Sequence, residues 1–166
     1  MFKVNDVVNY STTGACRIEE ISSRLMDGAE KTFYLLKPIF EDNATLMVPV
    51  ENELLVSRMR PVLTKAQVEK LVREIPSVEA KWIADDRLRF EEYKKTLVSP
   101  NRKDVVAVAK ALFVHRENQS KKGRKLRSMD ERFVREGERI ICTEIAYSLN
   151  ITLNEALQLV KEAFSK

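Results

Sequence analysis

The spacing of apolar residues changes near Arg60-Pro61, and this change limits what the chain can fold into. Before it, short runs with the composition of strands are separated by turn signals. After it, apolar residues recur with the three-to-four-residue period of amphipathic helices. A length of 166 residues allows two small units, each with a modest core. We therefore predict two domains, residues 1–60 and 61–166.

The first 60 residues contain five segments typical of strands: FKVNDVVNY, ACRIEEIS, TFYLLKPI, TLMVPV and LLVSR. Asp27-Gly28 lies between the second and the third, where a tight hairpin needs residues that accept a positive φ. Five strands in so short a span predict a strongly bent sheet or a small β-barrel, because closure removes exposed strand edges. One edge can remain open for binding.

Helix starts after residue 60 are marked by capping boxes, in which a hydroxyl and a later Glu or Gln satisfy each other's free backbone amides. The pattern occurs at Thr64 with Gln67, at Ser128 with Glu131, and at Thr152 with Glu155. We predict helices near residues 64–74, 78–98, 101–117, 129–149 and 152–165. The predicted fold class is thus α+β, a small β-barrel domain followed by an all-α domain of about five helices.

Several classes of function find no support in the residues. The sequence has no export signal and no run of 18 apolar residues, so we expect a cytoplasmic protein that does not enter membranes. Cys16 and Cys142 lie far apart and His115 is the only histidine, so we expect two buried, reduced thiols and no metal site. Neither a Gly-rich phosphate loop nor a nucleophile motif is visible. We therefore expect no enzyme, no cofactor and no small-molecule substrate.

Charge is spread unevenly along the chain. Residues 1–60 carry 7 Lys/Arg against 9 Asp/Glu, a net of −2, whereas residues 61–166 carry 22 against 16, a net of +6. Nine cations fall between residues 102 and 127: Arg102, Lys103, Lys110, Arg116, Lys121, Lys122, Arg124, Lys125 and Arg127. Such a run is usually a solvated face, but counterion release favours phosphate contact wherever DNA is near. Both interpretations remain open.

The only tryptophan, Trp82, lies in the charged stretch EAKWIADDRLRF. On a helix, five residues would share one apolar stripe: Trp82, Ile83, Phe90, Tyr93 and Leu97. A tryptophan in such a stripe is more often a buried anchor. However, Asp86 falls in the same stripe, and a carboxylate is seldom buried without a partner. If Trp82 is instead partly exposed, the cations beside it, Lys81, Arg87 and Arg89, could hold phosphates while the indole contacts bases.

These features together resemble the CarD/CdnL family of bacterial transcription regulators. The segments FKVNDVVNYSTTGACRIEEI, LMDGAEKTFYLLKP, LMVPVEN and MRPV are similar to the amino-terminal module of that family. A helical region with a single Trp, then a basic loop and ERIICTEIAYSLN, resembles its carboxy-terminal domain. The resemblance covers nearly the whole chain and preserves the order of the elements.

The resemblance implies a Tudor-like barrel that binds the β subunit of RNA polymerase, and a helical domain that contacts promoter DNA at the upstream edge of the melted region. Arg24 matches a polymerase-contacting arginine, and Met47 takes a position where some relatives carry a second one. Trp82 is the candidate for a wedge in the minor groove. The implied DNA-binding residues are Trp82, Arg87, Arg89, Arg102, Lys121, Lys122, Arg124, Lys125 and Arg127.

The expected function is that of a regulator which stabilises the open promoter complex through weak, largely sequence-independent DNA contacts. Nothing in the sequence requires a dimer, so we expect a monomer. An alternative is an adaptor that binds polymerase or another protein by strand addition, with Trp82 buried and no contact with DNA. An RNA-binding module would need more aromatic residues on the sheet than Phe33 and Tyr34.

Overall fold

The structure, a computed structural model, describes residues 1–166. Five strands form one antiparallel sheet in the order β4-β3-β2-β1-β5. Their bounds are β1 Val7–Tyr10, β2 Gly14–Met26, β3 Ala29–Pro38, β4 Leu46–Pro49 and β5 Met59–Pro61. The sheet is strongly bent and Tudor-like, as predicted, and a helical part follows it. The predicted α+β class is therefore confirmed.

The edge strands β4 and β5 do not pair with each other, so the sheet is open. The short helix α1 (Glu53–Ser57) contacts both of them. A strand is predicted here from LLVSR, and that prediction is wrong. The Asn52 side chain accepts a hydrogen bond from the backbone N–H of Leu55 and so caps a helix, and the fifth strand begins only at Met59.

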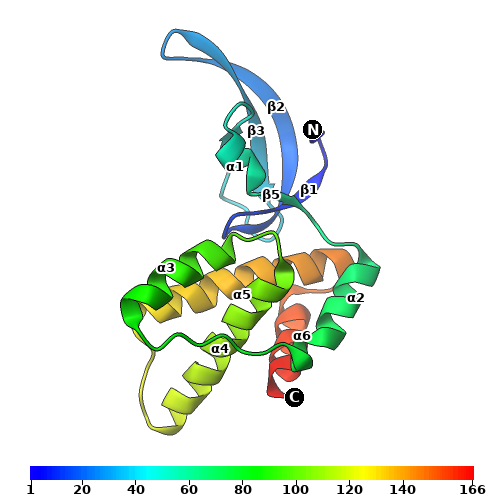
Figure 1. Cartoon of the computed structure of the whole chain (residues 1–166). Coiled ribbons are helices and arrows are strands. Elements are labelled where there is room, and N and C mark those ends of the chain that lie inside the picture. Colours follow the sequence, from blue (N-terminus) through cyan, green and yellow to red (C-terminus); the bar gives the residue numbers. More distant parts are fainter.

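Strands β2 and β3 form a long hairpin that projects beyond the small core of the sheet (Figure 1). Asp27 and Gly28 make its turn with φ of 52° and 77°, as the sequence predicts. The core beneath the hairpin's base is formed by seven buried residues: Val8, Cys16, Ile18, Tyr34, Leu36, Val48 and Met59. We call this part, which holds all five strands, the β module.

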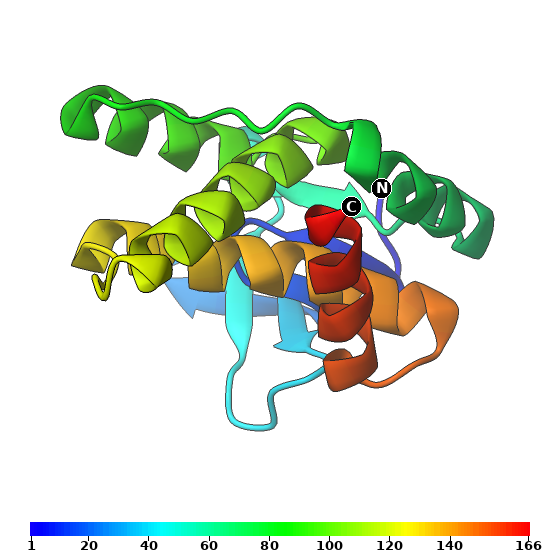
Figure 2. The same cartoon turned by 90° about the horizontal axis from the view of Figure 1, so that it is seen from below.

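The helical module holds the remaining helices around a separate core of 20 buried residues. Its elements are α2 Lys65–Glu74, a 3₁₀ turn at Ile75–Ser77, α3 Asp86–Leu97, α4 Arg102–Lys121, α5 Ser128–Leu149 and α6 Leu153–Ser165. The long helix α5 is central, because it packs against all four other helices and against β2. Figure 2 shows α4 crossing α5, with α6 beside both. None of the helices is long and apolar enough to cross a membrane.

Two of the three predicted capping boxes are present. The hydroxyls of Thr64 and Thr152 each accept a bond from the backbone N–H three residues on, and the side chain of that Gln or Glu accepts one from the backbone N–H of the cap residue. The third prediction is wrong, because Ser128 lies inside α5 and Arg127 takes the cap position without a side-chain hydrogen bond. The predicted helix 78–98 is also too long, since α3 begins only at Asp86.

Candidate functional site

Trp82 lies in residues 78–85, which form neither helix nor strand; we call them the Trp82 segment. The Asp85 carboxylate accepts a bond of 2.8 Å from the backbone N–H of Leu88 and caps α3. The helix therefore starts after Trp82. The predicted position of Trp82 in an apolar stripe of this helix is therefore wrong, because the helix does not include the tryptophan.

The Trp82 segment is nevertheless fixed by hydrogen bonds on both sides of the tryptophan. The N–H of Lys81 donates to the carbonyl of Ala107 on α4 (3.1 Å), and the Tyr93 hydroxyl donates to the carbonyl of Lys81. Burial raises the pKa of Tyr93 to about 12, so this phenol remains a donor at neutral pH. Beyond Trp82, Arg89 donates to the carbonyl of Ile83 (2.9 Å).

Arg89 is a structural residue and does not face solvent. Its side chain is 2% exposed and pairs with the equally buried Asp130, through Nε to Oδ1 and Nη2 to Oδ2, each at 2.9 Å. Nη2 also donates to Asp86 at 2.9 Å. The prediction that Arg89 binds phosphate is thus corrected, because its charge is already used by two carboxylates inside the protein.

Trp82 itself is partly exposed, at 37%. The Arg89 guanidinium lies over its ring, 4.6 Å from the ring centroid. The imidazole of His115 on α4 stacks on the indole with a centroid distance of 3.9 Å and an interplanar angle of 19°. The indole is thus neither sealed in the core nor freely mobile. Sequence reasoning assigns no role to His115, because nothing in the sequence relates it to a residue 33 positions earlier.

A surface pocket of about 420 Å³ lies beside this stack. The indole, His115 and Gln119 form part of its wall, and Asp86 and Asp130 add acidic groups. The connection between α4 and α5 adds Arg124, Lys125, Leu126 and Arg127 to the lining. The only tryptophan and the most basic segment of the chain, far apart in the sequence, therefore border the same hollow.

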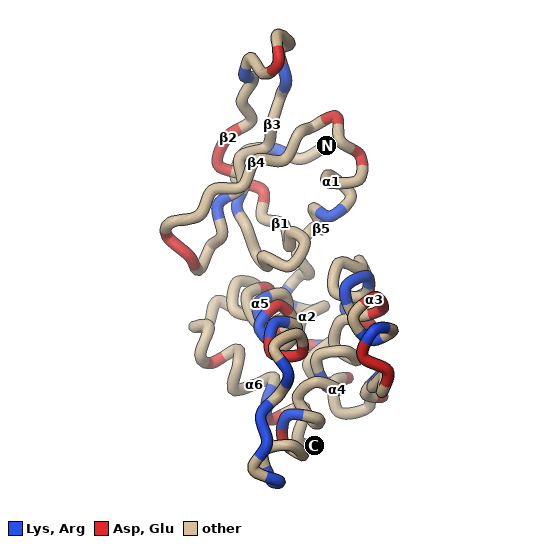
Figure 3. The backbone as a smooth tube through the Cα atoms, turned by 90° about the vertical axis from the view of Figure 1, so that its left-hand side faces the viewer, with Lys and Arg blue, Asp and Glu red and all other residues tan.

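We call residues 121–127 the basic loop. Gly123, with φ of 67°, ends α4 and turns the chain. All five cations of the basic loop are exposed, and only Arg127 has a carboxylate partner, Asp86. In Figure 3 they form a run of basic residues at the end of the helical module. Four cations are unpaired and available to an external anion: Lys121, Lys122, Arg124 and Lys125.

The other two arginines predicted to bind DNA differ from each other. Arg87 lies on the first turn of α3 with its side chain 90% exposed, 3.7 Å from Glu91. Such a surface pair is weak and leaves the guanidinium accessible. Arg102 is only 10% exposed and pairs with the buried Glu144 at 2.7 Å. Its predicted phosphate contact is corrected too, because Arg102 belongs to the junction between the modules.

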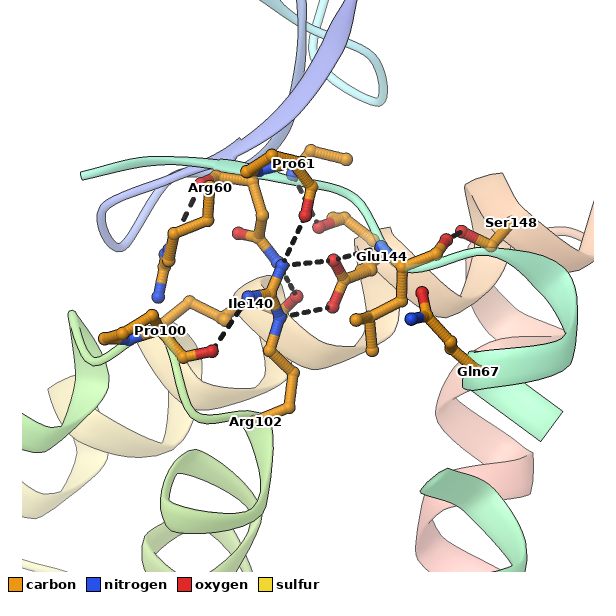
Figure 4. Close-up of polar contacts among 12 residues, drawn as sticks. Arg60, Pro61, Gln67, Pro100, Arg102, Ile140, Glu144 and Ser148 are labelled. Carbon is orange, nitrogen blue, oxygen red and sulfur yellow. Dashed lines mark hydrogen bonds and ion pairs between the residues drawn. The ribbon is translucent and has the colours of Figure 1, made fainter. Parts of the chain in front are cut away.

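That junction is shown in Figure 4. Arg102 donates to both carboxylate oxygens of Glu144, at 3.0 and 2.7 Å, and to the backbone carbonyl of Pro61 at 2.9 Å. Glu144 also accepts a bond from the N–H of Leu63 (3.1 Å), and Ser148 donates to the carbonyl of the same residue (2.7 Å). One buried ion pair therefore fixes the chain where it passes from sheet to helices.

Arg60 on β5 makes a second set of contacts across the junction. It donates to the carbonyls of Asn9 (3.2 Å) and Ser11 (2.6 Å) in the β module and to that of Ser99 (2.8 Å) in the helical module. Burial and the neighbouring charge of Arg102 lower the pKa of Arg60 to about 10, so it stays charged at neutral pH.

Strand β2 also packs directly on α5. Gly14 has φ of 91°, and a Cβ atom at this residue would lie 2.6 Å from the carbonyl oxygen of Arg139. The next residue, Ala15, donates its N–H to the hydroxyl of Thr143 at 2.9 Å. Only glycine permits this approach. The modules are thus in close contact, and the β face described next has a fixed position relative to Trp82.

The two predicted polymerase-binding residues share one face of the sheet. Arg24 on β2 is paired with Lys31 on β3, and Met47 on β4 is paired with Leu35 on β3. Paired residues point to the same side, and side chains alternate along a strand, so Lys31 and Leu35 point the same way. Tyr34, which belongs to the core, points to the opposite side.

We call this outer surface the β face. It is formed by Arg24, Met26, Lys31, Phe33 and Met47. Met26 and Met47 are 44% and 40% exposed, and Phe33 is buried among its neighbours. A surface with exposed methionines, a covered aromatic ring and two unpaired cations has the composition of a protein-binding face.

The part of the chain that carries this face matches a known family. Residues 2–63 match the family model of the CarD-like/TRCF RID domain. The matched range includes all five strands, so it coincides with the β module. The resemblance inferred from the sequence is confirmed over these residues. Residues 2–63 of this chain are therefore similar to the CarD-like/TRCF RID domain, and this match supports an RNA polymerase-interacting role in transcription for the β module.

Proposed function

We propose that this protein is a transcription regulator that stabilises the open promoter complex. Residues 1–60 act as the domain that binds the β subunit of RNA polymerase, and residues 61–166 act as the domain that contacts DNA. The protein works as a monomer at the upstream edge of the bubble. The observation that carries this proposal is the position of Trp82, partly exposed at the surface beside the basic loop.

The β face is the proposed site for polymerase. Arg24 lies near the end of the projecting hairpin, and Met47 lies on the open edge strand β4. The two residues point to the same side of the sheet, so one partner surface can contact both. The family of the β module supports polymerase as that partner.

The proposed DNA contact combines the exposed edge of Trp82 with cations that hold phosphates. Of the nine residues predicted from the sequence, seven remain on the surface: Trp82, Arg87, Lys121, Lys122, Arg124, Lys125 and Arg127. Phosphate contacts give weak, salt-dependent affinity without reading sequence. An indole edge that enters only an unstacked base step adds a preference for melted DNA.

This preference is what makes the protein a regulator. A ligand that binds open and closed promoters equally well does not change the ratio of the two states, whereas one that favours the open state raises its population. A preference of about 1.4 kcal/mol raises the open-to-closed ratio about tenfold. Attachment to polymerase raises the local concentration, so the helical module needs little DNA affinity of its own.

The test of the polymerase contact is capture of purified RNA polymerase by the immobilised full-length protein. Arg24→Glu reverses a charge at the β face and is expected to weaken capture at least tenfold. Lys65→Glu makes the same change of charge at an exposed position on α2 and is expected to leave capture unchanged. Equal capture by both variants would remove the β face from the proposal.

The DNA contact is tested by comparing the affinity of the protein for two DNA molecules. One is a forked DNA, a duplex of which one half is unpaired, and the other has the same sequence fully paired. The wild-type protein is expected to prefer the forked DNA, and Trp82→Ala is expected to lose that preference while keeping salt-dependent binding through the basic loop. If the protein binds neither DNA, the adaptor without DNA contact becomes the better account.

A further inference from the structure

His115 is, together with Arg89, one of two residues outside the Trp82 segment that lie against the indole ring. It comes from the middle of α4, its ring stacks on Trp82 at 3.9 Å, and its Nε2 lies 3.4 Å from the Gln119 amide nitrogen. It is also the only side chain of this surface that can change its charge near neutral pH. A change of charge on His115 therefore acts directly at the proposed DNA contact.

Charged groups reach His115 from three elements. Asp130 approaches from α5, Arg89 from α3 and Lys122 from the end of α4. The pocket beside it adds Asp86 from α3 and the basic-loop cations Arg124, Lys125 and Arg127. Burial lowers the pKa of His115 below its ordinary 6.5; Asp130 raises it, and Arg89 and Lys122 lower it. The imidazole of the free protein is therefore mostly neutral at pH 7.

Bound DNA would instead favour the protonated form of His115. Phosphates drawn to the basic loop bring negative charge next to His115 and neutralise the cations that disfavour its protonation. The indole face also attracts a cation, so a protonated imidazole keeps its place on Trp82. A group whose pKa is higher in the complex than in the free protein takes up a proton on binding. Binding then becomes tighter as the pH falls.

We propose that His115 is a positioning residue for Trp82 and that DNA binding by the helical module takes up a proton at this histidine. This inference rests on the proposed function, because it concerns the same DNA contact. The predicted behaviour is pH-dependent DNA affinity, with each unit of pKa difference between complex and free protein giving about tenfold tighter binding over the full pH range.

The first half of the test uses the fluorescence of Trp82, which is the only tryptophan of the protein. An imidazolium quenches an indole in contact with it more strongly than a neutral imidazole does. In the free protein the emission is expected to fall on acidification with a midpoint below 6.5, and forked DNA is expected to move that midpoint upward. His115→Phe keeps an aromatic ring on the indole but cannot titrate, so its emission is expected to stay constant over this range.

The second half measures the affinity for labelled forked DNA between pH 5.5 and about 8 at constant salt. The wild type is expected to bind tighter at the acid end, His115→Phe to bind with the high-pH affinity throughout, and His115→Ala to bind more weakly because the indole loses its support. Equal pH dependence in wild type and His115→Phe overturns the inference and leaves the proposed function intact. Absence of DNA binding at every pH overturns both.

Discussion

Arg87 and Arg89 show how two similar residues on one helix come to have different roles. Both are arginines beside the tryptophan, and nothing in their sequence context separates them. The partner of Arg89 is Asp130, which lies 41 residues later and reaches it only because α5 packs against α3. Arg87 points to solvent from the same turn. Position on the helix, and not residue type, decides which of the two guanidinium groups is accessible to an external anion.

Arg89→Ala is predicted to destabilise the protein by about 3–5 kcal/mol, because it leaves the buried Asp130 carboxylate without its partner. Arg87→Ala is predicted to change the free energy of unfolding by less than about 0.5 kcal/mol. Urea denaturation followed by circular dichroism measures both. A similar effect of the two substitutions would show that the Arg89–Asp130 pair does not form.

The Trp82 segment and the basic loop are the two elements that make the proposed DNA surface. Apart from Lys121, the last residue of α4, they have no regular secondary structure, yet both are held by the helices on either side of them. The loop carries four unpaired cations, so its contribution to binding is electrostatic and depends on salt. In the proposed contact, the indole would contribute by meeting bases, and this contribution would depend less on salt. The two contributions can therefore be separated by experiment.

Replacing the unpaired cations of the basic loop by glutamine is predicted to reduce the salt dependence of DNA binding. The slope of log K against log salt falls by about 0.9 for each phosphate that the variant no longer neutralises. The matched control removes four exposed cations elsewhere: Lys3, Lys65, Lys70 and Arg73. It is predicted to change the slope far less. Equal slopes in the two quadruple variants would mean that net charge, and not the basic loop, governs binding.

The elements differ in how far the sequence can predict them. The starts of the helices at Thr64 and Thr152 are predicted to within a residue, because a capping box is a local signal. The start of α3 is not predicted correctly, because the helical spacing of apolar residues extends back through the Trp82 segment. The helix begins only after Asp85, which caps it. The segment LLVSR favours a strand by its composition, and Asn52 outweighs that preference by capping a helix.

At the scale of the whole molecule, the main feature is the contact between the modules. Glu144 on α5 accepts bonds from Arg102 and from the backbone of the linking segment, and Arg60 joins carbonyls of both modules. The sequence does not predict that these residues meet, because Arg60 lies on β5, Arg102 on α4 and Glu144 on α5. With the modules fixed to each other, a polymerase bound at the β face, as proposed, would have Trp82 at a defined position relative to it.

Glu144→Ala is predicted to destabilise the junction by about 3–5 kcal/mol, since it leaves Arg102 partly buried without a counter-charge. Glu138→Ala is the control on the same helix, because its pair with Arg116 is long, at 3.7 Å, and partly exposed. We expect the wild type to unfold in one transition and Glu144→Ala in two, as measured by calorimetry. A single transition in Glu144→Ala would show that other contacts couple the modules.

The two cysteines allow the modules to be followed separately. Cys16 lies in the core of the β module and Cys142 in that of the helical module, and burial raises the pKa of each to about 12. Neither thiol is therefore expected to react with iodoacetamide in the folded protein. In pulsed labelling across a urea series, both thiols are predicted to become reactive at the same urea concentration in the wild type, and at different urea concentrations in Glu144→Ala. Reaction of either thiol without denaturant would contradict the burial.

The most direct measurement is the lifetime of open promoter complexes formed by RNA polymerase with the wild-type protein and with Trp82→Ala. We predict that the wild type lengthens the lifetime and that Trp82→Ala shortens it again by about tenfold, corresponding to about 1.4 kcal/mol, while polymerase capture stays unchanged. Leu88→Ala, which removes an exposed apolar side chain on the neighbouring helix α3, is predicted to behave like the wild type. An equal lifetime with wild type and Trp82→Ala would contradict the account.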